Sequence, residues 1–153
     1  MPSSINFMEI LLVEDNPSDV ELTVGAFENC KIANKINVVN DGEEALDYLY
    51  KRKNYADAQR PNVILLDLNL PRQNGQEILQ VIKNDDSLKS IPVVILTSSE
   101  AERDVLKSYN LHANCYIIKP VDAEKFLQVV SSIENFWLGV VKLPIQNINK
   151  LAS

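Results

Sequence analysis

Five short apolar segments alternate along the chain with segments in which apolar residues recur every three or four positions. The clearest apolar segment is 62–67, where Val63 to Leu66 lead directly into Asp67. A continuous apolar run of this length is typical of a strand buried on both faces, as in a parallel sheet. Four similar runs predict the other strands, at 10–13, 36–39, 92–96 and 115–118.

Polar residues mark the beginnings of the predicted helices. Asn16 followed by Pro17 predicts a helix start, as do the capping boxes Asp41–Glu44 and Ser99–Glu102 and the capping residue Asp122. The apolar residues expected on the helices are Val20, Val24 and Phe27, then Ala45, Leu46, Tyr48 and Leu49, then Ile78, Leu79 and Ile82, then Val105 and Leu106, and finally Phe126, Val129, Val130 and Ile133. The last apolar face continues through Phe136, Trp137 and Val140, so we expect one long final helix that ends at Pro144.

Strands that alternate with helices predict an α/β fold, in which a doubly wound five-stranded parallel sheet carries helices on both faces. The 153 residues can form one domain with a sizeable core. We place that domain at 8–144, with a polar surface connection at 51–60 and a loose tail at 145–153.

Composition and charge exclude several classes of function. The chain is 46% hydrophobic and 24% charged, as expected for a globular protein, and its net charge of −6 argues against nucleic acid or an anionic membrane as a partner. No apolar run reaches the roughly 18 residues of a membrane span, and 1–8 lacks the features of a signal peptide, so we expect a cytoplasmic protein. Cys30, Cys115 and the single His112 lack the spacing of a zinc site. The two cysteines could form a disulfide, but we expect them to be buried thiols.

Polar residues with complementary chemistry end the predicted strands. Because the carboxyl ends of parallel strands meet at one edge, these residues should converge there: Glu14, Asp15, Asp67, Thr97 and Lys119. Three neighbouring carboxylates repel one another unless a cation lies between them, and oxygen ligands of this kind suit Mg²⁺. A carboxylate nucleophile, a hard metal ion, a lysine and a hydroxyl are the parts needed for phosphoryl transfer to an aspartate.

Four segments resemble the receiver domain of two-component response regulators, namely 12–17, 65–71, 95–98 and 116–120. The resemblance implies a flavodoxin-like sheet in the order 2-1-3-4-5 and a phosphoacceptor role for Asp67. It further implies that Glu14, Asp15, Asp67 and the backbone carbonyl of Asn69 bind Mg²⁺ or Mn²⁺. Lys119 would bind the phosphoryl group, Thr97 and Tyr116 would form the switch pair, and the Lys119–Pro120 bond is often cis in this family.

Segments 51–60, 113–116 and 136–144 also resemble the single-domain cyanobacterial phytochrome response regulators, which implies a phytochrome-type histidine kinase as partner. We expect output through protein contacts or phosphate relay, because no further domain follows residue 144. Two positions depart from the family pattern. Glu14 stands where aspartate is commoner, and His112 stands where glycine is common.

Two other functions are alternatives to a phosphoryl-accepting signalling domain. A phosphohydrolase with an aspartyl nucleophile would need an acid two residues after Asp67, where the chain has Asn69. A pseudo-receiver that only binds partners would not need Asp67, Thr97 and Lys119 together.

The apolar face of the last helix predicts a homodimer through Phe126, Val130, Ile133, Phe136, Trp137 and Val140.

Overall fold

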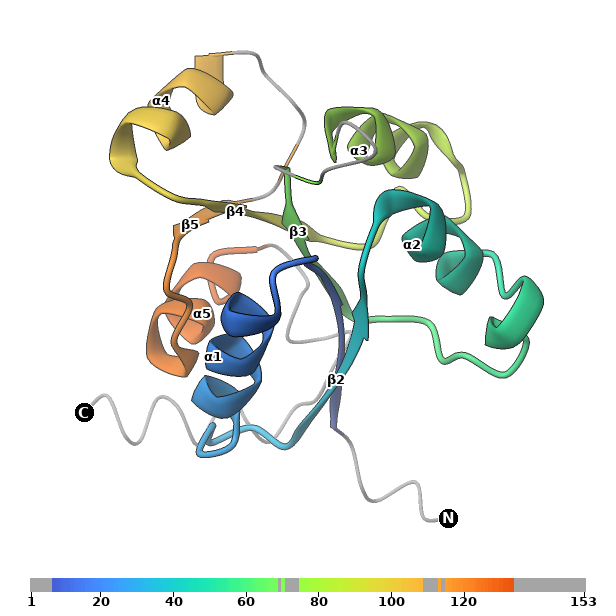
Figure 1. The fold of residues 1–153 in the computed structure, drawn as a ribbon, viewed down its shortest axis with the longest axis horizontal. Coiled ribbons are helices and arrows are strands. Elements are labelled where there is room, and N and C mark those ends of the chain that lie inside the picture. Colours follow the sequence, from blue (N-terminus) through green and yellow to red (C-terminus); the bar gives the residue numbers. More distant parts are fainter. Residues whose placement is uncertain (1–6, 69, 71–74, 109–112, 114, 134–153) are drawn as a thin grey trace.

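One parallel sheet in the order β2-β1-β3-β4-β5 organises the molecule (Figure 1). The computed structural model describes residues 7–68, 70, 75–108, 113 and 115–133. The strands are β1 (Met8–Val13), β2 (Asn34–Val39), β3 (Val63–Asp67), β4 (Val93–Thr97) and β5 (Cys115–Ile118). The helices are α1 (Pro17–Phe27), α2 (Gly42–Leu49), α3 (Gly75–Asn84), α4 (Glu100–Ser108) and α5 (Ala123–Val130), and η2 (Lys53–Tyr55) is a 3-10 turn. The predicted fold class and strand order are confirmed.

The register of the sheet brings the polar strand ends together. Val13 pairs with Leu66, so Glu14 follows β1 at the level of Asp67. On the other side of β3, Asp67 pairs with Leu96, and Thr97 is the next residue of β4. Strand β2 lies on one side of β1 and β3 lies on the other, so the strand order reverses at β1. In open α/β sheets, ligands usually bind at such a point, at the carboxyl ends of the two strands concerned, here β1 and β3.

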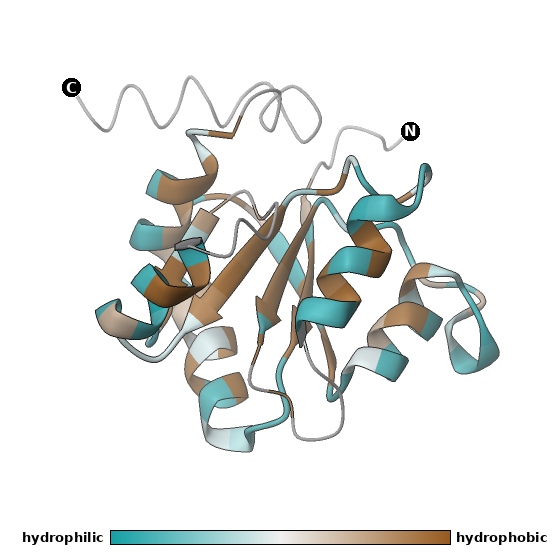
Figure 2. Ribbon diagram, turned by 90° about the horizontal axis from the view of Figure 1, so that it is seen from above, coloured by the Kyte–Doolittle hydropathy of each residue, from teal (hydrophilic) through white to brown (hydrophobic). Residues whose placement is uncertain are grey.

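Two helical layers cover the sheet (Figure 1). Helices α1 and α5 pack on one face, and α2, α3 and α4 pack on the other. Alternate residues of each strand enter the two cores: Leu11, Ile64 and Ile95 enter the core under α2 and α3, and Leu12, Leu65 and Leu96 enter the core under α1 and α5. Figure 2 shows the consequence, since the strands are apolar and the helices turn their polar sides outward.

The helix caps form as expected, and they fix the loops beside the site. Asn16 Oδ1 accepts the backbone N–H groups of Ser18 and Asp19 at the start of α1. Asp41 accepts the N–H of Glu44 at 2.8 Å, and Ser99 accepts that of Glu102 at 3.1 Å. These bonds satisfy donors that the first helical turn leaves without a partner.

Two valines differ from their expected burial. Val105 is 52% exposed, whereas its neighbour Leu106 is buried in the core under α2 and α3, so of these two positions of α4 only Leu106 faces the sheet. In β2, Val39 is fully buried but Val38 is 36% exposed, because β2 is an edge strand with a less covered outer face.

The final α-helix is shorter than the sequence pattern predicts, and this prediction is corrected. Helix α5 has eight residues and ends at Val130 instead of continuing to Pro144. The hydroxyls of Ser131 and Ser132 donate to the carbonyls of Gln128 and Val129, and such side-chain bonds compete with the helical ladder. The predicted extension and tail at 134–153 lie outside the described residues.

The connection 51–60 is more ordered than a simple surface loop. Tyr55 and Ala58 pack against the core under α2, and the Tyr55 hydroxyl donates to Glu44. Arg60 donates to the carbonyl of Ser87 at 2.6 Å and to the hydroxyl of Ser90 at 3.0 Å. The segment thereby links α2 to the loop between α3 and β4.

Candidate phosphoacceptor site

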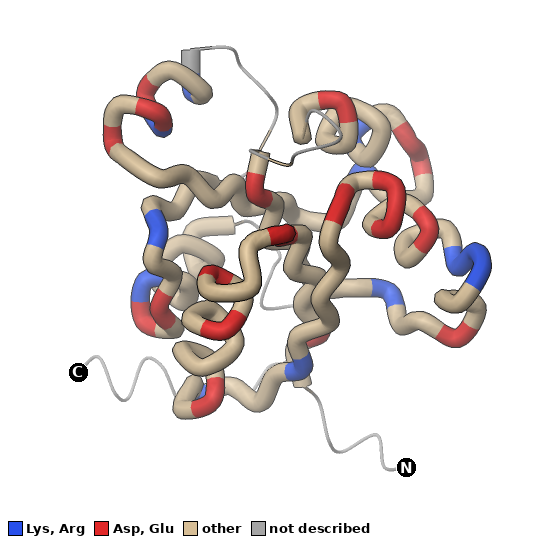
Figure 3. The backbone as a smooth tube through the Cα atoms, viewed as in Figure 1, with Lys and Arg blue, Asp and Glu red and all other residues tan. Residues whose placement is uncertain are grey.

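Three carboxylates meet at the carboxyl edge of the sheet. Oxygen atoms of Glu14, Asp15 and Asp67 all lie within 4.8 Å of one another. Glu14 and Asp67 are buried, and Asp15 is exposed. Figure 3 shows the acidic ends of β1 and β3 beside each other. The sequence prediction that these acids converge is therefore confirmed.

Lys119 contacts two of these three acids. Its Nζ is 2.8 Å from Asp67 Oδ2 and 2.9 Å from Glu14 Oε1, although it follows β5 on the far side of β4. The backbone N–H of Lys119 donates to the carbonyl of Thr97 at 2.7 Å, which fixes the residue beside β4. The Lys119–Pro120 peptide bond is cis, as the resemblance leads one to expect.

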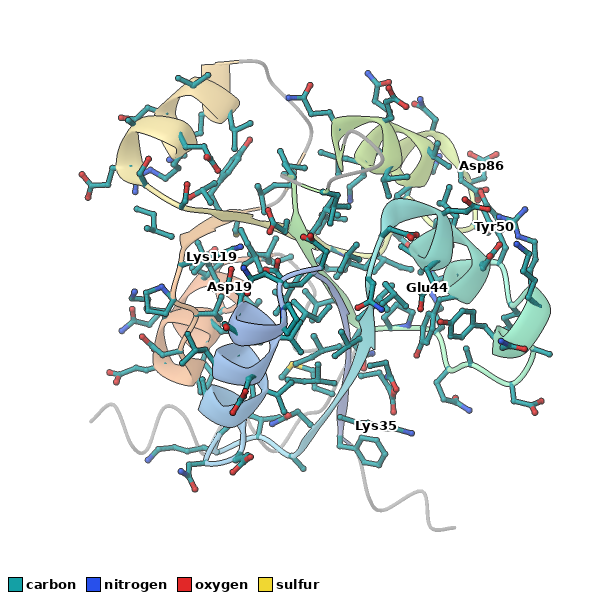
Figure 4. All side chains as sticks on the ribbon, viewed as in Figure 1. Asp19, Lys35, Glu44, Tyr50, Asp86 and Lys119 are labelled. Carbon is teal, nitrogen blue, oxygen red and sulfur yellow. The ribbon has the colours of Figure 1, made fainter. Side chains whose placement is uncertain are left out.

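Asp19 is the site residue that sequence reasoning missed. Its Oδ2 accepts a hydrogen bond from Lys119 Nζ at 3.0 Å, across 100 positions of sequence. Figure 4 shows the two side chains approaching each other from α1 and from the end of β5. A signal was present, because an acid at the third position after the Asn16 cap must lie in the first helical turn, at the same edge as the strand ends.

The electrostatics of the site follow from this crowding of charge. Burial raises the pKa of Glu14 to about 7, and a hydrogen bond with Asp67 adds to the rise, while the hydrogen bond with Lys119 lowers it. Burial alone would lower the pKa of Lys119, but hydrogen bonds with Asp67, Glu14 and Asp19 outweigh it, so the pKa is raised well above its usual value. Lys119 is thus a permanent cation among acids that repel one another.

Thr97 and Tyr116 occupy neighbouring strands next to the acidic group. Thr97 is fully buried, and its hydroxyl lies 3.5 Å from the carbonyl of Ser99. Tyr116 is half-buried, burial raises its pKa, and the Nζ of Lys107 lies 5.8 Å from the centre of its ring. The two predicted switch residues therefore lie on adjacent strands, with Tyr116 in contact with α4.

The donor set fits a hard divalent cation. Three carboxylates supply only oxygen ligands, as Mg²⁺ and Mn²⁺ require. The raised pKa of Glu14 reflects repulsion and burial that such an ion would offset. The fourth predicted ligand, the backbone carbonyl of Asn69, lies outside the described residues.

The predicted dimer residues divide into two groups. Phe126 and Val130 are fully buried in the core between α5 and the sheet, so the prediction that they face a partner is corrected. Ile133 packs partly against the same core. Phe136, Trp137 and Val140 lie outside the described residues, as does His112.

The structure also tests the expectations for the cysteines and for a membrane span. Cys30 and Cys115 are free thiols, and both are partly rather than fully buried. In the described part of the chain, no helix has the length and apolar character needed to cross a membrane.

Comparison with known proteins agrees with the fold and the geometry. The response regulator receiver domain model matches residues 10–131. The response regulator Rcp1 of Synechocystis sp. (strain PCC 6803) is 44% identical over 135 residues, which cover 88% of this chain and 92% of Rcp1. A solved structure of Rcp1 in its Mn²⁺-bound form superposes with a TM-score of 0.67 at 42% identity, covering 88% of this chain and 97% of that one.

Two further solved structures are similar. The bacteriophytochrome response regulator RtBRR superposes with a TM-score of 0.77 at 47% identity, and the match covers 86% of this chain and 80% of the RtBRR chain. The phosphorylated cyanobacterial phytochrome response regulator RcpA has a TM-score of 0.68 at 47% identity, covering 86% and 94%. Receiver domains are signalling modules that bind Mg²⁺ or Mn²⁺, and the acidic group of this chain matches that requirement. The chain belongs to the response regulator receiver domain family and is related to the phytochrome response regulators.

Proposed function

We propose that Asp67 accepts a phosphoryl group from a phosphohistidine of a histidine kinase. The bond between the histidine nitrogen and phosphorus breaks as a bond from an Asp67 carboxylate oxygen to phosphorus forms. Water later attacks the phosphorus, which releases phosphate and restores the carboxylate. The observation that carries this proposal is the contact of Lys119 Nζ with Asp67 Oδ2 at 2.8 Å inside the acidic group.

Glu14, Asp15, Asp67 and the backbone carbonyl of Asn69 would hold Mg²⁺ or Mn²⁺. When bound, the ion supplies positive charge against the oxygens of the phosphoryl group. Lys119 supplies a second positive charge from the side of β5, and its raised pKa keeps it protonated throughout. Together they offset the negative charge that would otherwise keep a phosphoryl group away from three carboxylates.

Thr97 and Tyr116 are proposed as the switch pair. The Thr97 hydroxyl, now 3.5 Å from the Ser99 carbonyl, would turn toward a phosphoryl oxygen, and Tyr116 would move into the space that it leaves. Such a change requires that the phosphoryl group bind the two conformations with different affinity. The output would then pass to a partner through protein contacts or by phosphate relay.

The proposed phosphodonor is a phytochrome-type histidine kinase. Support comes from the similarity to Rcp1 at 44% identity and to RtBRR at 47% identity, over most of each chain. The alternative of a phosphohydrolase with an aspartyl nucleophile has less support, because the residue two positions after Asp67 is Asn69 rather than an acid. A pseudo-receiver has less support because Asp67 and Lys119 are in direct contact.

Phosphotransfer from a purified phytochrome-type kinase, phosphorylated on its histidine, tests the proposal. With Mg²⁺ the wild-type chain should acquire a label that is labile in acid and in alkali, as an acyl phosphate is, and Asp67→Asn or a chelator should abolish it. Asp86→Asn is the matched control, because Asp86 is an exposed acid in the loop after α3 and should leave labelling unchanged. Full labelling of Asp67→Asn would show that another residue accepts the phosphoryl group.

The same assay separates the switch from the acceptor. Thr97→Ala should still accept the phosphoryl group, because the hydroxyl is not the nucleophile. It should lose the change in kinase or partner affinity that phosphorylation causes in the wild type. A variant that keeps that change would contradict the role of Thr97.

A further inference from the structure

We propose that Asp19 is a positioning residue that competes with the phosphoryl group for Lys119. The inference rests on the proposed function of Asp67 and concerns the regulation of the same site. Asp19 would hold the ammonium group of Lys119 away from incoming anions, and would thereby set how tightly the site retains a phosphoryl group. Its carboxylate is not part of the three-acid group that could bind a metal ion.

The contact is specific in its geometry. Lys119 Nζ lies 3.0 Å from Asp19 Oδ2, almost as close as to Asp67 Oδ2 at 2.8 Å. With Glu14 Oε1 at 2.9 Å, three carboxylates lie within ion-pair distance of the Lys119 ammonium group. A phosphoryl oxygen that approaches Lys119 therefore competes with these carboxylates for its positive charge, and with Asp19 and Asp67 for its hydrogen bonds.

Asp19 is held where it can act. It lies in the first turn of α1, and its backbone N–H is bound by the Asn16 side chain at 3.0 Å. Its side chain is about one-third exposed, whereas that of Lys119 is 19% exposed, so the ion pair lies at the mouth of the site. Asp19 can keep its contact with Lys119 while Glu14 and Asp67 turn toward a cation, because it comes from a different element.

Charge gives the direction of the effect. Asp67 carries one negative charge before phosphoryl transfer, and its phosphorylated form carries about two. Every additional carboxylate nearby opposes that increase, and Asp19 also takes up part of the positive charge of Lys119. Removal of the Asp19 charge should therefore favour the phosphorylated state and should not favour binding of a cation.

The test uses the Mg²⁺-dependent binding of beryllofluoride, a phosphoryl mimic, measured by calorimetry at saturating Mg²⁺. Asp19→Asn should bind beryllofluoride about fivefold or more tightly than the wild type, and should bind Mg²⁺ alone equally or more weakly. Glu21→Gln removes the same charge from an exposed position of α1 and should match the wild type. Asp19→Glu restores the charge and should also match the wild type.

A gain in anion binding without a gain in cation binding distinguishes this role from a structural one, because a damaged fold would weaken both. Unchanged or weaker beryllofluoride binding by Asp19→Asn would overturn the inference, and so would an equal gain in Glu21→Gln. A gain of full size in the Lys119→Met background would show that Asp19 does not act through Lys119. Failure of the wild type itself to bind beryllofluoride would instead remove the proposed function, and this inference with it.

Discussion

Glu14 is the residue at which proton binding and cation binding compete most directly. It is buried beside Asp67 and Lys119, and its pKa is raised to about 7 by burial and by the hydrogen bond with Asp67. Near neutral pH the carboxyl group therefore carries a proton in part of the molecules. A cation at this site must displace that proton, so metal affinity should rise as the pH rises through 7.

The same shift predicts how stability without metal depends on pH. Glu14 binds its proton more tightly in the folded chain than at its ordinary value of 4.5. Its contribution to the free energy of unfolding is fully present below pH 4.5, is lost as the pH rises through about 7, and amounts to on the order of 3 kcal/mol. With chelator present, thermal melting from pH 5 to pH 8 should show a smaller decline in Glu14→Gln than in the wild type.

Glu21→Gln is the control for this measurement, because Glu21 is exposed on α1 and should leave the pH profile unchanged. Parallel profiles for the wild type and Glu14→Gln would contradict the raised pKa.

At the scale of elements, α1 and α5 form a layer held to the sheet by a pair of aromatic rings. Phe27 and Phe126 pack edge to face with centroids 5.0 Å apart, and Phe126 is fully buried. Helix α5 has only eight residues, and Phe126 and Val130 are its two buried ones. The layer also supports the site, because α1 carries Asp19 and the loop before α5 carries Lys119.

Phe126→Ala should therefore lower the free energy of unfolding by about 3–5 kcal/mol, the usual cost of truncating a buried aromatic residue. Denaturant unfolding measures this loss. Val105→Ala is a suitable comparison, because Val105 is 52% exposed on α4 and should change stability by about 0.5 kcal/mol or less. A loss for Phe126→Ala as small as that for Val105→Ala would show that the ring pair does not hold the layer.

The sequence predicts an element well when neighbouring residues mark it. The apolar run Val63–Leu66 and the caps at Asn16 and Asp122 fix strands and helix starts, and they give the sheet and most of the site. It fails where the signal is ambiguous or distant. Ser131 and Ser132 end α5 without glycine or proline, and Asp19 meets Lys119 only because the fold joins positions 100 residues apart.

At the scale of the whole molecule, the site exists only when the sheet is complete. Lys119 joins α1, β1 and β3 to the end of β5, across separations of 52 and 100 residues for Asp67 and Asp19. The proposed switch residues Thr97 and Tyr116 lie on β4 and β5, and the Lys107 side chain of α4 lies over the Tyr116 ring. If these two residues act as proposed, a change at Asp67 would reach the surface made by α4 and β5 across the neighbouring strands β4 and β5.

The homodimer remains a prediction, and fewer residues are left to form its interface. Phe126 and Val130 belong to the core, so the apolar residues left for a partner are Phe136, Trp137 and Val140, which the sequence places after α5. Large aromatic residues at the centre of an interface each contribute about 2 kcal/mol or more. Light scattering at tens of micromolar should give the mass of a dimer for the wild type and of a monomer for the Phe136→Ala, Trp137→Ala double variant.

Val81→Ala controls for the loss of an apolar side chain elsewhere, because Val81 is 39% exposed on α3 and should leave the mass of the dimer unchanged. Thermal melting of the double variant separates the two possible roles of the aromatic residues. If they cover their own domain instead of a partner, the melting temperature falls and the mass stays that of the wild type. A wild type that is monomeric both with and without beryllofluoride and Mg²⁺ would exclude the dimer, because neither state of the switch would then assemble.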